Sequence, residues 1–112
     1  MPVVAKTDYV NTKFSVDKDT VVKLIDDDGF RHNATIVNTH TSKVAIIGGE
    51  AINNKTDMNA KGAPLYPGQS YTTKSISALY CILVDGTAGA VDVRVITEEE
   101  SKAFSVPNQD GA

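Results

Sequence analysis

The stretch that decides the fold is residues 79–95, LYCILVDGTAGAVDVRV. Its last part, Val91-Asp92-Val93-Arg94-Val95, alternates strictly between apolar and charged residues. Because successive side chains of a β-strand point to opposite faces, this period of two buries the valines and exposes the charges. Residues 79–84 form a continuous apolar run, which predicts a strand buried on both faces. The glycine-containing segment 85–90 predicts that the two strands form a hairpin with a turn longer than two residues.

Strand chemistry recurs on the N-terminal side of this stretch. We expect a second hairpin from residues 20–25 and 33–38, with its turn at Asp26-Asp27-Asp28-Gly29. Two more strands are expected at 43–47 and 69–73, because both segments are rich in β-branched or aromatic residues.

The connections between these strands carry turn and loop residues. Residues 53–62 are polar and predict a loop, and Pro67-Gly68 suits the central positions of a type II turn. No segment has the apolar periodicity of an amphipathic helix of three turns.

Strands at intervals of about 8–12 residues predict an all-β fold, a small antiparallel β-sandwich of the jelly-roll or Ig-like kind. We expect one sandwich domain over residues 19–97, flanked by extended arms. Residues 1–18 are an N-terminal arm or an edge strand, and residues 98–112 are a polar C-terminal tail. The expected core residues are Ile36, Val44, Ile46, Leu79, Ile82, Val93 and Val95.

Composition argues against several classes of function. The formal net charge is -3 and the Lys and Arg residues are scattered singly, so we expect no nucleic-acid partner. The longest apolar run, 79–84, is far shorter than a membrane helix, and the first residues do not resemble a signal peptide. We therefore expect no membrane partner and synthesis in a cytoplasm. The single cysteine, Cys81, is interpreted as a small buried hydrophobic residue.

Two groups of residues are candidates for ligand sites. His32 and His40 lie near the tri-aspartate segment, but a metal site needs three or four converging ligands. The segment also lacks the alternating oxygen ligands of a calcium loop. We therefore expect no metal. No Ser/His/Asp or Cys/His arrangement has supporting sequence context, so we also expect no cofactor, no catalytic residues and no enzyme activity. A calcium contact at a subunit interface and glycan binding through Tyr66 and Tyr71 stay open as alternatives.

The order of these segments is more specific than any one of them. The series is a strand ending in Asn, a strand ending in Gly-Gly, a Pro-Leu-X-Pro-Gly turn, a Leu-Tyr strand and a short alternating strand. It resembles a small β-sandwich module of tailed-phage head decoration (cement), head-fibre and tail-fibre proteins. The matching segments are Arg31–Asn38, Lys43–Gly49, Gly62–Ser70, Ala78–Ile82 and Val91–Val95.

This resemblance implies a virion structural protein without catalysis. The first expectation is a head decoration protein on the capsid exterior, which binds and reinforces the capsid lattice. Its partners would be the major capsid protein, other copies of itself in a homotrimer, and a head-fibre protein. One alternative is a fibre-base or tail-fibre module for host attachment, and another is a soluble carbohydrate-binding module.

The polar chain ends carry a few apolar residues that suit docking to a partner. The candidate capsid or subunit contacts are Val3, Val4, Tyr9, Val10, Phe104 and Val106. An edge strand over residues 9–16 of the same domain is the alternative for the N-terminal members.

Overall fold

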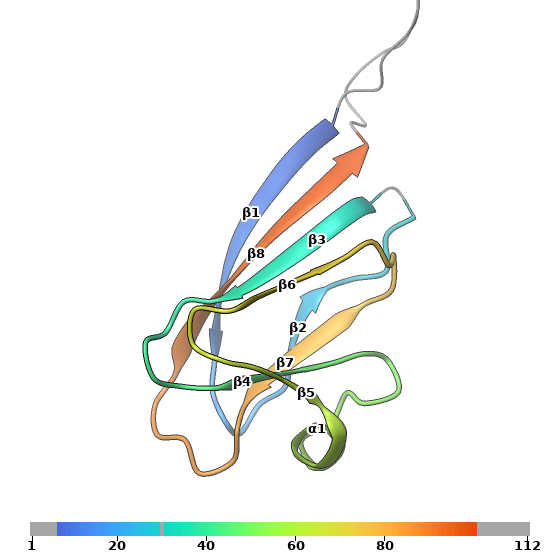
Figure 1. Cartoon of the computed structure of the whole chain (residues 1–112). Coiled ribbons are helices and arrows are strands. Elements are labelled where there is room, and N and C mark those ends of the chain that lie inside the picture. The colour runs from blue at the N-terminus through green and yellow to red at the C-terminus, as the bar shows by residue number, and fades with distance from the viewer. Residues whose placement is uncertain (1–6, 30, 101–112) are drawn as a thin grey trace, which may run out of the picture.

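The computed structural model describes residues 7–29 and 31–100, and over these residues the chain forms eight strands and one short helix (Figure 1). In chain order they are β1 (Thr7–Val16), β2 (Val22–Ile25), β3 (Arg31–Asn38), β4 (Ala45–Gly48), α1 (Lys55–Lys61), β5 (Ala63–Leu65), β6 (Ser70–Thr73), β7 (Leu79–Leu83) and β8 (Val91–Glu100).

The strands form two four-stranded antiparallel sheets that pack together as a sandwich. The first sheet has the order β1-β8-β3-β6 and the second has the order β2-β7-β4-β5. The chain pairs as one long ribbon, in which β1 joins β8, β2 joins β7, β3 joins β6 and β4 joins β5. Rolling this ribbon also places β8 beside β3 and β7 beside β4. This is the topology of a jelly roll, and it confirms the predicted β-sandwich.

Both predicted hairpins are wrong. The strands β2 and β3 lie in different sheets, as do β7 and β8. Segments 26–29 and 85–90 therefore cross from one sheet to the other instead of reversing the chain within a sheet. The alternation of apolar residues reports which face of a strand is buried, and it does not identify the strand that pairs with it.

The inward faces of the two sheets form the core. In β8, Val91, Val93 and Val95 are buried while Arg94 is exposed, as the alternation predicts. Five of the seven expected core residues are buried, and the other two, Val44 and Leu79, are half-buried. Val44 precedes β4 and Leu79 begins β7, so both lie where a sheet starts and the cover from the opposite sheet is incomplete.

The predicted loop at 53–62 contains the helix α1. The side chain of Asn54 caps this helix by accepting a hydrogen bond of 2.9 Å from the backbone N–H of Asp57. Met58 is fully buried and packs with Ile46 and Ile82 in a small second cluster. Only one helical residue is buried, which is why the segment shows no apolar periodicity.

The type II turn expected at Pro67-Gly68 is confirmed. Gly68 has a φ of 77°, and the N–H of Gln69 donates to the carbonyl of Tyr66 at 2.9 Å. This turn connects β5 in the second sheet with β6 in the first.

The strands β1 and β8 pair along their whole length, from Thr7 opposite Glu100 to Val16 opposite Val91. Of the two possibilities for the N-terminal segment, Thr7–Val16 is an edge strand, and its Val16 is fully buried. The strand β8 continues to Glu100, beyond residue 98 where we expected a polar tail to begin. Both ends of the described chain therefore lie side by side at one end of the sandwich (Figure 1).

Candidate interaction surfaces

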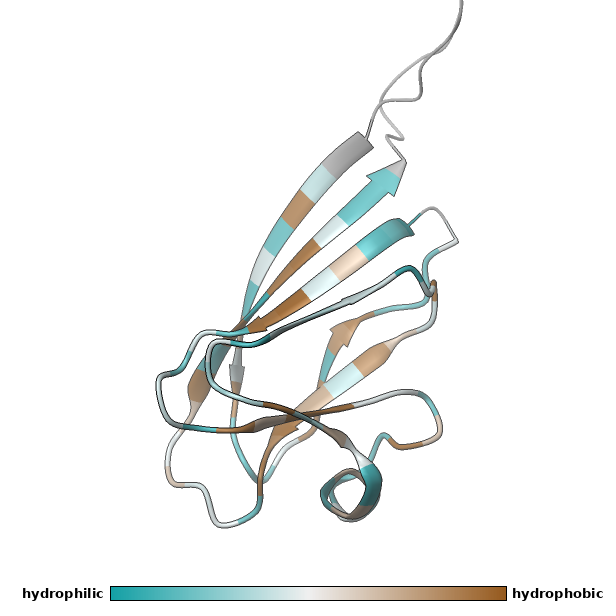
Figure 2. Ribbon diagram, viewed as in Figure 1, coloured by the Kyte–Doolittle hydropathy of each residue, from teal (hydrophilic) through white to brown (hydrophobic). Residues whose placement is uncertain are grey.

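Acidic residues gather at the end of the sandwich where the chain enters and leaves. Asp26, Asp27 and Asp28 follow β2, and Glu98 and Glu99 lie near the end of β8. We call these five residues the acidic end. Figure 2 shows the hydrophilic tip of β8 beyond its hydrophobic portion. The acidic end concentrates negative charge on a chain whose formal net charge is only -3.

A cleft of about 570 Å³ opens between the two sheets at the acidic end. Its walls combine apolar residues of both sheets with the acidic loop: Val10, Thr12, Leu24, Ile25, Asp26, Asp27, Asp28, Gly29, Arg31, Val95, Thr97 and Glu99. The cleft exists because β1 and β8 extend past the point where β2 ends, so part of their inward face has no opposing strand.

Arg31 fixes the loop beside this cleft. Its side chain is 4% exposed and donates to three backbone carbonyls, of Asp26 at 2.7 Å, Ser75 at 2.8 Å and Ser77 at 2.9 Å. The carboxylate of Asp27 accepts from the N–H of Ala78 at 2.7 Å, which ties the same two loops together. Sequence reasoning missed this role because an arginine at the start of a strand normally lies in solvent.

Asn38 holds the opposite end of β3 in a comparable way. It is fully buried, and its side-chain amide donates to the carbonyls of Lys43 at 2.7 Å and Leu65 at 3.0 Å. Its side-chain oxygen accepts from the N–H of His40 at 3.1 Å. The asparagine that ends β3 in the sequence pattern therefore joins that strand to the turn at 40–43 and to β5.

The candidate metal residues do not converge. The Nδ1 atom of His40 accepts from the N–H groups of Ser42 at 3.0 Å and Lys43 at 3.1 Å, so it stabilises a turn. The carboxylate of Asp26 pairs with Lys23 at 2.8 Å. Across residues 7–29 and 31–100 no three His, Cys, Asp or Glu side chains are grouped so that they could hold a metal ion.

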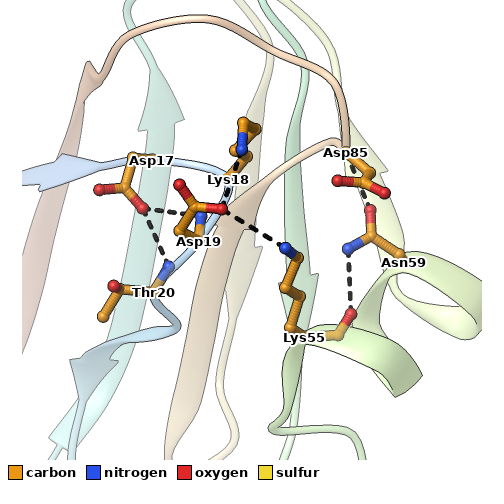
Figure 3. Close-up of polar contacts among 7 residues, drawn as sticks. All are labelled: Asp17, Lys18, Asp19, Thr20, Lys55, Asn59 and Asp85. Carbon is orange, nitrogen blue, oxygen red and sulfur yellow. Dashed lines mark hydrogen bonds and ion pairs between the residues drawn. The ribbon is translucent and has the colours of Figure 1, made fainter.

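A polar network closes the other end of the molecule (Figure 3). Asp17 accepts from the N–H groups of Asp19 at 2.8 Å and Thr20 at 2.9 Å. Asp19 also pairs with Lys18 and with Lys55 of α1, and these contacts lower the pKa of its carboxyl group. Through Asn59, whose side-chain oxygen accepts from the N–H of Asp85 at 3.0 Å, α1 is tied to the β7–β8 crossover.

A second, more apolar cleft of about 350 Å³ lies between the opposite edges of the two sheets. It is lined by Ile47, Gly48, Gly49, Ala63, Pro64, Leu65, Gln69, Ser70, Tyr71 and Leu79. Tyr71 lies at this cleft and is 45% exposed, and Tyr66 on the adjoining turn is 52% exposed. These are the two tyrosines that the sequence offered for glycan binding.

Two of the expected contact residues, Tyr9 and Val10, lie on β1. Tyr9 is 64% exposed on the outer face of the first sheet, while Val10 is 46% exposed and lines the cleft at the acidic end. The structure thus places these neighbours on opposite faces of one strand. The other four expected contacts, Val3, Val4, Phe104 and Val106, lie outside the described residues.

Comparison with known proteins identifies the fold. No family model and no curated protein matches the chain. A crystal structure of the stem and receptor-binding domain of the spike protein P1 from bacteriophage PM2 matches 76% of this chain with a TM-score of 0.56 and 19% identity. The chain spans only about a third, 32%, of the length of that spike chain.

A protein of Bacillus endospore appendages, which form disulfide-linked pili, matches 90% of this chain and 93% of its own, with a TM-score of 0.48 and 17% identity. No helix in the described part of the chain is long and apolar enough to span a membrane. At 19% identity, the match to the spike domain of phage PM2 shows the fold alone: a β fold of this kind also occurs in a phage spike protein.

Proposed function

We propose that this chain is a non-enzymatic structural module on the exterior of a phage virion, and within that class a head decoration protein. The observation that carries the proposal is that the two ends of the jelly roll differ. Both described chain ends and the acidic residues lie at one end, and a polar network closes the other. A module built in this way can attach through one end and expose a rigid surface at the other.

Further support comes from the interior of the sandwich. The two crossovers at either end of β3 are fixed by the buried side chains of Arg31 and Asn38, each with several hydrogen bonds. A buried amide whose groups are hydrogen-bonded, as that of Asn38 is, rigidifies a core. A rigid, compact β domain suits a protein that reinforces a lattice, with the major capsid protein as its partner and many copies acting together.

The second candidate is an attachment module, which binds a receptor on the host. It is favoured by the fold that this chain shares with the spike domain of phage PM2. Tyr66 and Tyr71, both exposed, would supply aromatic surface for a sugar receptor in that case.

A copy count on purified particles tests the proposal. Mass spectrometry with isotope-labelled peptides of this chain and of the major capsid protein gives the number of copies per particle. Decoration of a symmetric lattice predicts on the order of hundreds of copies, and an attachment module predicts far fewer. Absence of the chain from purified particles contradicts both candidates.

A glycan array separates the attachment module further. Binding of a sugar that is lost in Tyr71→Ala, but kept when Tyr80 is changed to Phe, would favour attachment over decoration. Tyr80 is the matched control because its hydroxyl is bonded to Glu50 at 2.7 Å and its ring lies over neither cleft.

A further inference from the structure

The four edge strands of the two sheets differ in how well they are protected from pairing with another chain. The edges β2 and β5 are short, with a register irregularity in the first and Pro64 in the second. The edge β6 has only four residues. Short strands, irregularities and prolines are the usual means by which proteins prevent pairing between edges.

The edge strand β1 has none of these three features. Its exposed Lys13 is a charged residue of the kind that also protects edges. It spans ten residues, contains no proline and pairs with β8 in an unbroken register. Over residues 7–29 and 31–100 it has no strand on its other side, so one side of its backbone is free to bond. Two of its apolar side chains, Tyr9 and Val10, are well exposed.

We propose that β1 of one copy pairs antiparallel with β1 of a second copy about a two-fold axis at Asn11. The two first sheets then form one continuous sheet of eight strands. An axis perpendicular to the sheet keeps both sandwiches on the same face, so residues that share a face of β1 meet each other across the pair.

The outer face of β1 is complementary to itself in this register. Its exposed row is Tyr9, Asn11, Lys13 and Ser15. Centring on Asn11 places Asn11 opposite Asn11 and places each Tyr9 ring opposite a Lys13 ammonium group. A cation over an aromatic ring is favourable, and here the contact occurs twice.

Charge on the neighbouring strand favours the same arrangement. In β8, Arg94 lies opposite Lys13 and Glu98 lies opposite Tyr9. The carboxylate of Asp92 lies 3.9 Å from the Lys13 ammonium group and offsets part of the positive charge there, so the ribbon is weakly basic around Arg94 and Lys13 and acidic at Glu98. Antiparallel pairing sets the basic part of one copy beside the acidic part of the other. An axis at Lys13 would instead oppose two lysines, which is unfavourable for directly facing residues.

Light scattering after size-exclusion chromatography tests the proposal on the full chain. We expect twice the 11.9 kDa mass of one chain. A monomer at every concentration overturns the proposal, and so does a trimer, the state implied by the resemblance to decoration proteins.

Cross-linking tests the position of the axis. In Asn11→Cys the two introduced thiols face each other and should form an intermolecular disulfide under mild oxidation. In the matched control Ser15→Cys, on the same row, eight residues of strand separate the two thiols along the pair. They therefore lie about 26 Å apart and should not cross-link. Cys81 is fully buried, and this burial also raises the pKa of its thiol to about 12, so the native cysteine does not compete. Equal cross-linking of both variants overturns the register.

A charge reversal tests the facing pairs. Lys13→Glu should weaken the dimer by about tenfold or more because it replaces two cation–aromatic contacts by unfavourable ones. Lys74→Glu makes the same change in net charge at an exposed site beyond β6 and should leave the dimer unchanged. Equal dimerisation of the two variants contradicts the proposal, and thermal unfolding by circular dichroism confirms that both are folded.

Discussion

Ile82 shows what a single side chain contributes to the sandwich. It is fully buried between the second sheet and α1, in contact with the cluster that contains Met58. We expect Ile82→Ala to lower the free energy of unfolding by about 2–5 kcal/mol, because a cavity adds to the lost transfer energy. Urea unfolding followed by circular dichroism measures the loss.

The control for Ile82 lies two residues further along the chain. Val84 is 38% exposed, so Val84→Ala should change stability by about 0.5 kcal/mol or less. Equal losses in the two variants would mean that the burial of a side chain in this segment does not determine how much it stabilises the fold.

Tyr80 gives a pH-dependent prediction at the same scale. Its hydroxyl donates a hydrogen bond of 2.7 Å to Glu50, and this bond raises the pKa of the phenol above its ordinary value of 10.0. Because the folded-state pKa is raised, the bond stabilises the fold below pH 10 and is lost as the pH rises through the folded-state pKa. We expect Glu50→Gln to lower the pKa of Tyr80, as measured by ultraviolet titration. An unchanged titration would contradict this assignment.

At the scale of elements, β1 decides where the domain begins. Phe14 packs against the core and Val16 is buried within it, so β1 contributes apolar surface as well as hydrogen bonds. A chain that starts at residue 19 and ends at 97 lacks all of β1 and the last residues of β8. We expect this chain to lose its cooperative unfolding transition and its β circular-dichroism signal.

The matched control begins at Thr7 and keeps every described strand. It should unfold at the same temperature as the full chain. If the 19–97 chain instead folds with full stability, β1 is dispensable and the sandwich is smaller than the jelly roll described here.

The sequence predicts the elements better than it predicts their pairing. The positions of β3, β4, β6, β7 and β8 follow from β-branched runs and alternation, since burial of one face leaves that trace in any strand. The partners of these strands leave no such trace, and both expected hairpins were therefore wrong. The helix α1 was missed because its cap, Asn54, and its one buried residue, Met58, give too weak a pattern.

The candidate surfaces were predictable only in part, for a reason that belongs to the whole molecule. Tyr9 and Val10 were recognisable as apolar residues in a polar segment. The cleft at the acidic end, in contrast, is built from β1 and β2 together with β8, which is distant from both in sequence and meets them only in the folded sandwich. Arg31 acquires its buried role through carbonyls more than forty residues away.

The same topology predicts slow folding. The strands β1 and β8, at the two ends of the described chain, pair along their whole length. Such non-local pairing must close most of the chain before it is stabilised, so we expect refolding in milliseconds to seconds, which is typical of all-β folds. Stopped-flow fluorescence of the tyrosines measures this rate. Refolding within microseconds would contradict the rolled-ribbon topology.

The pairing of Thr7 with Glu100 also has an engineering consequence. Thr7 and Glu100 lie one strand spacing apart, so residues 7–100 enter and leave the sandwich through a junction about as narrow as the base of a surface loop. The sandwich could therefore be inserted whole into a loop of a host protein, with little distortion of the host. Joining Thr7 to Glu100 through a short linker, and opening the chain at the exposed Gly29, would give a circular permutant with the same two sheets.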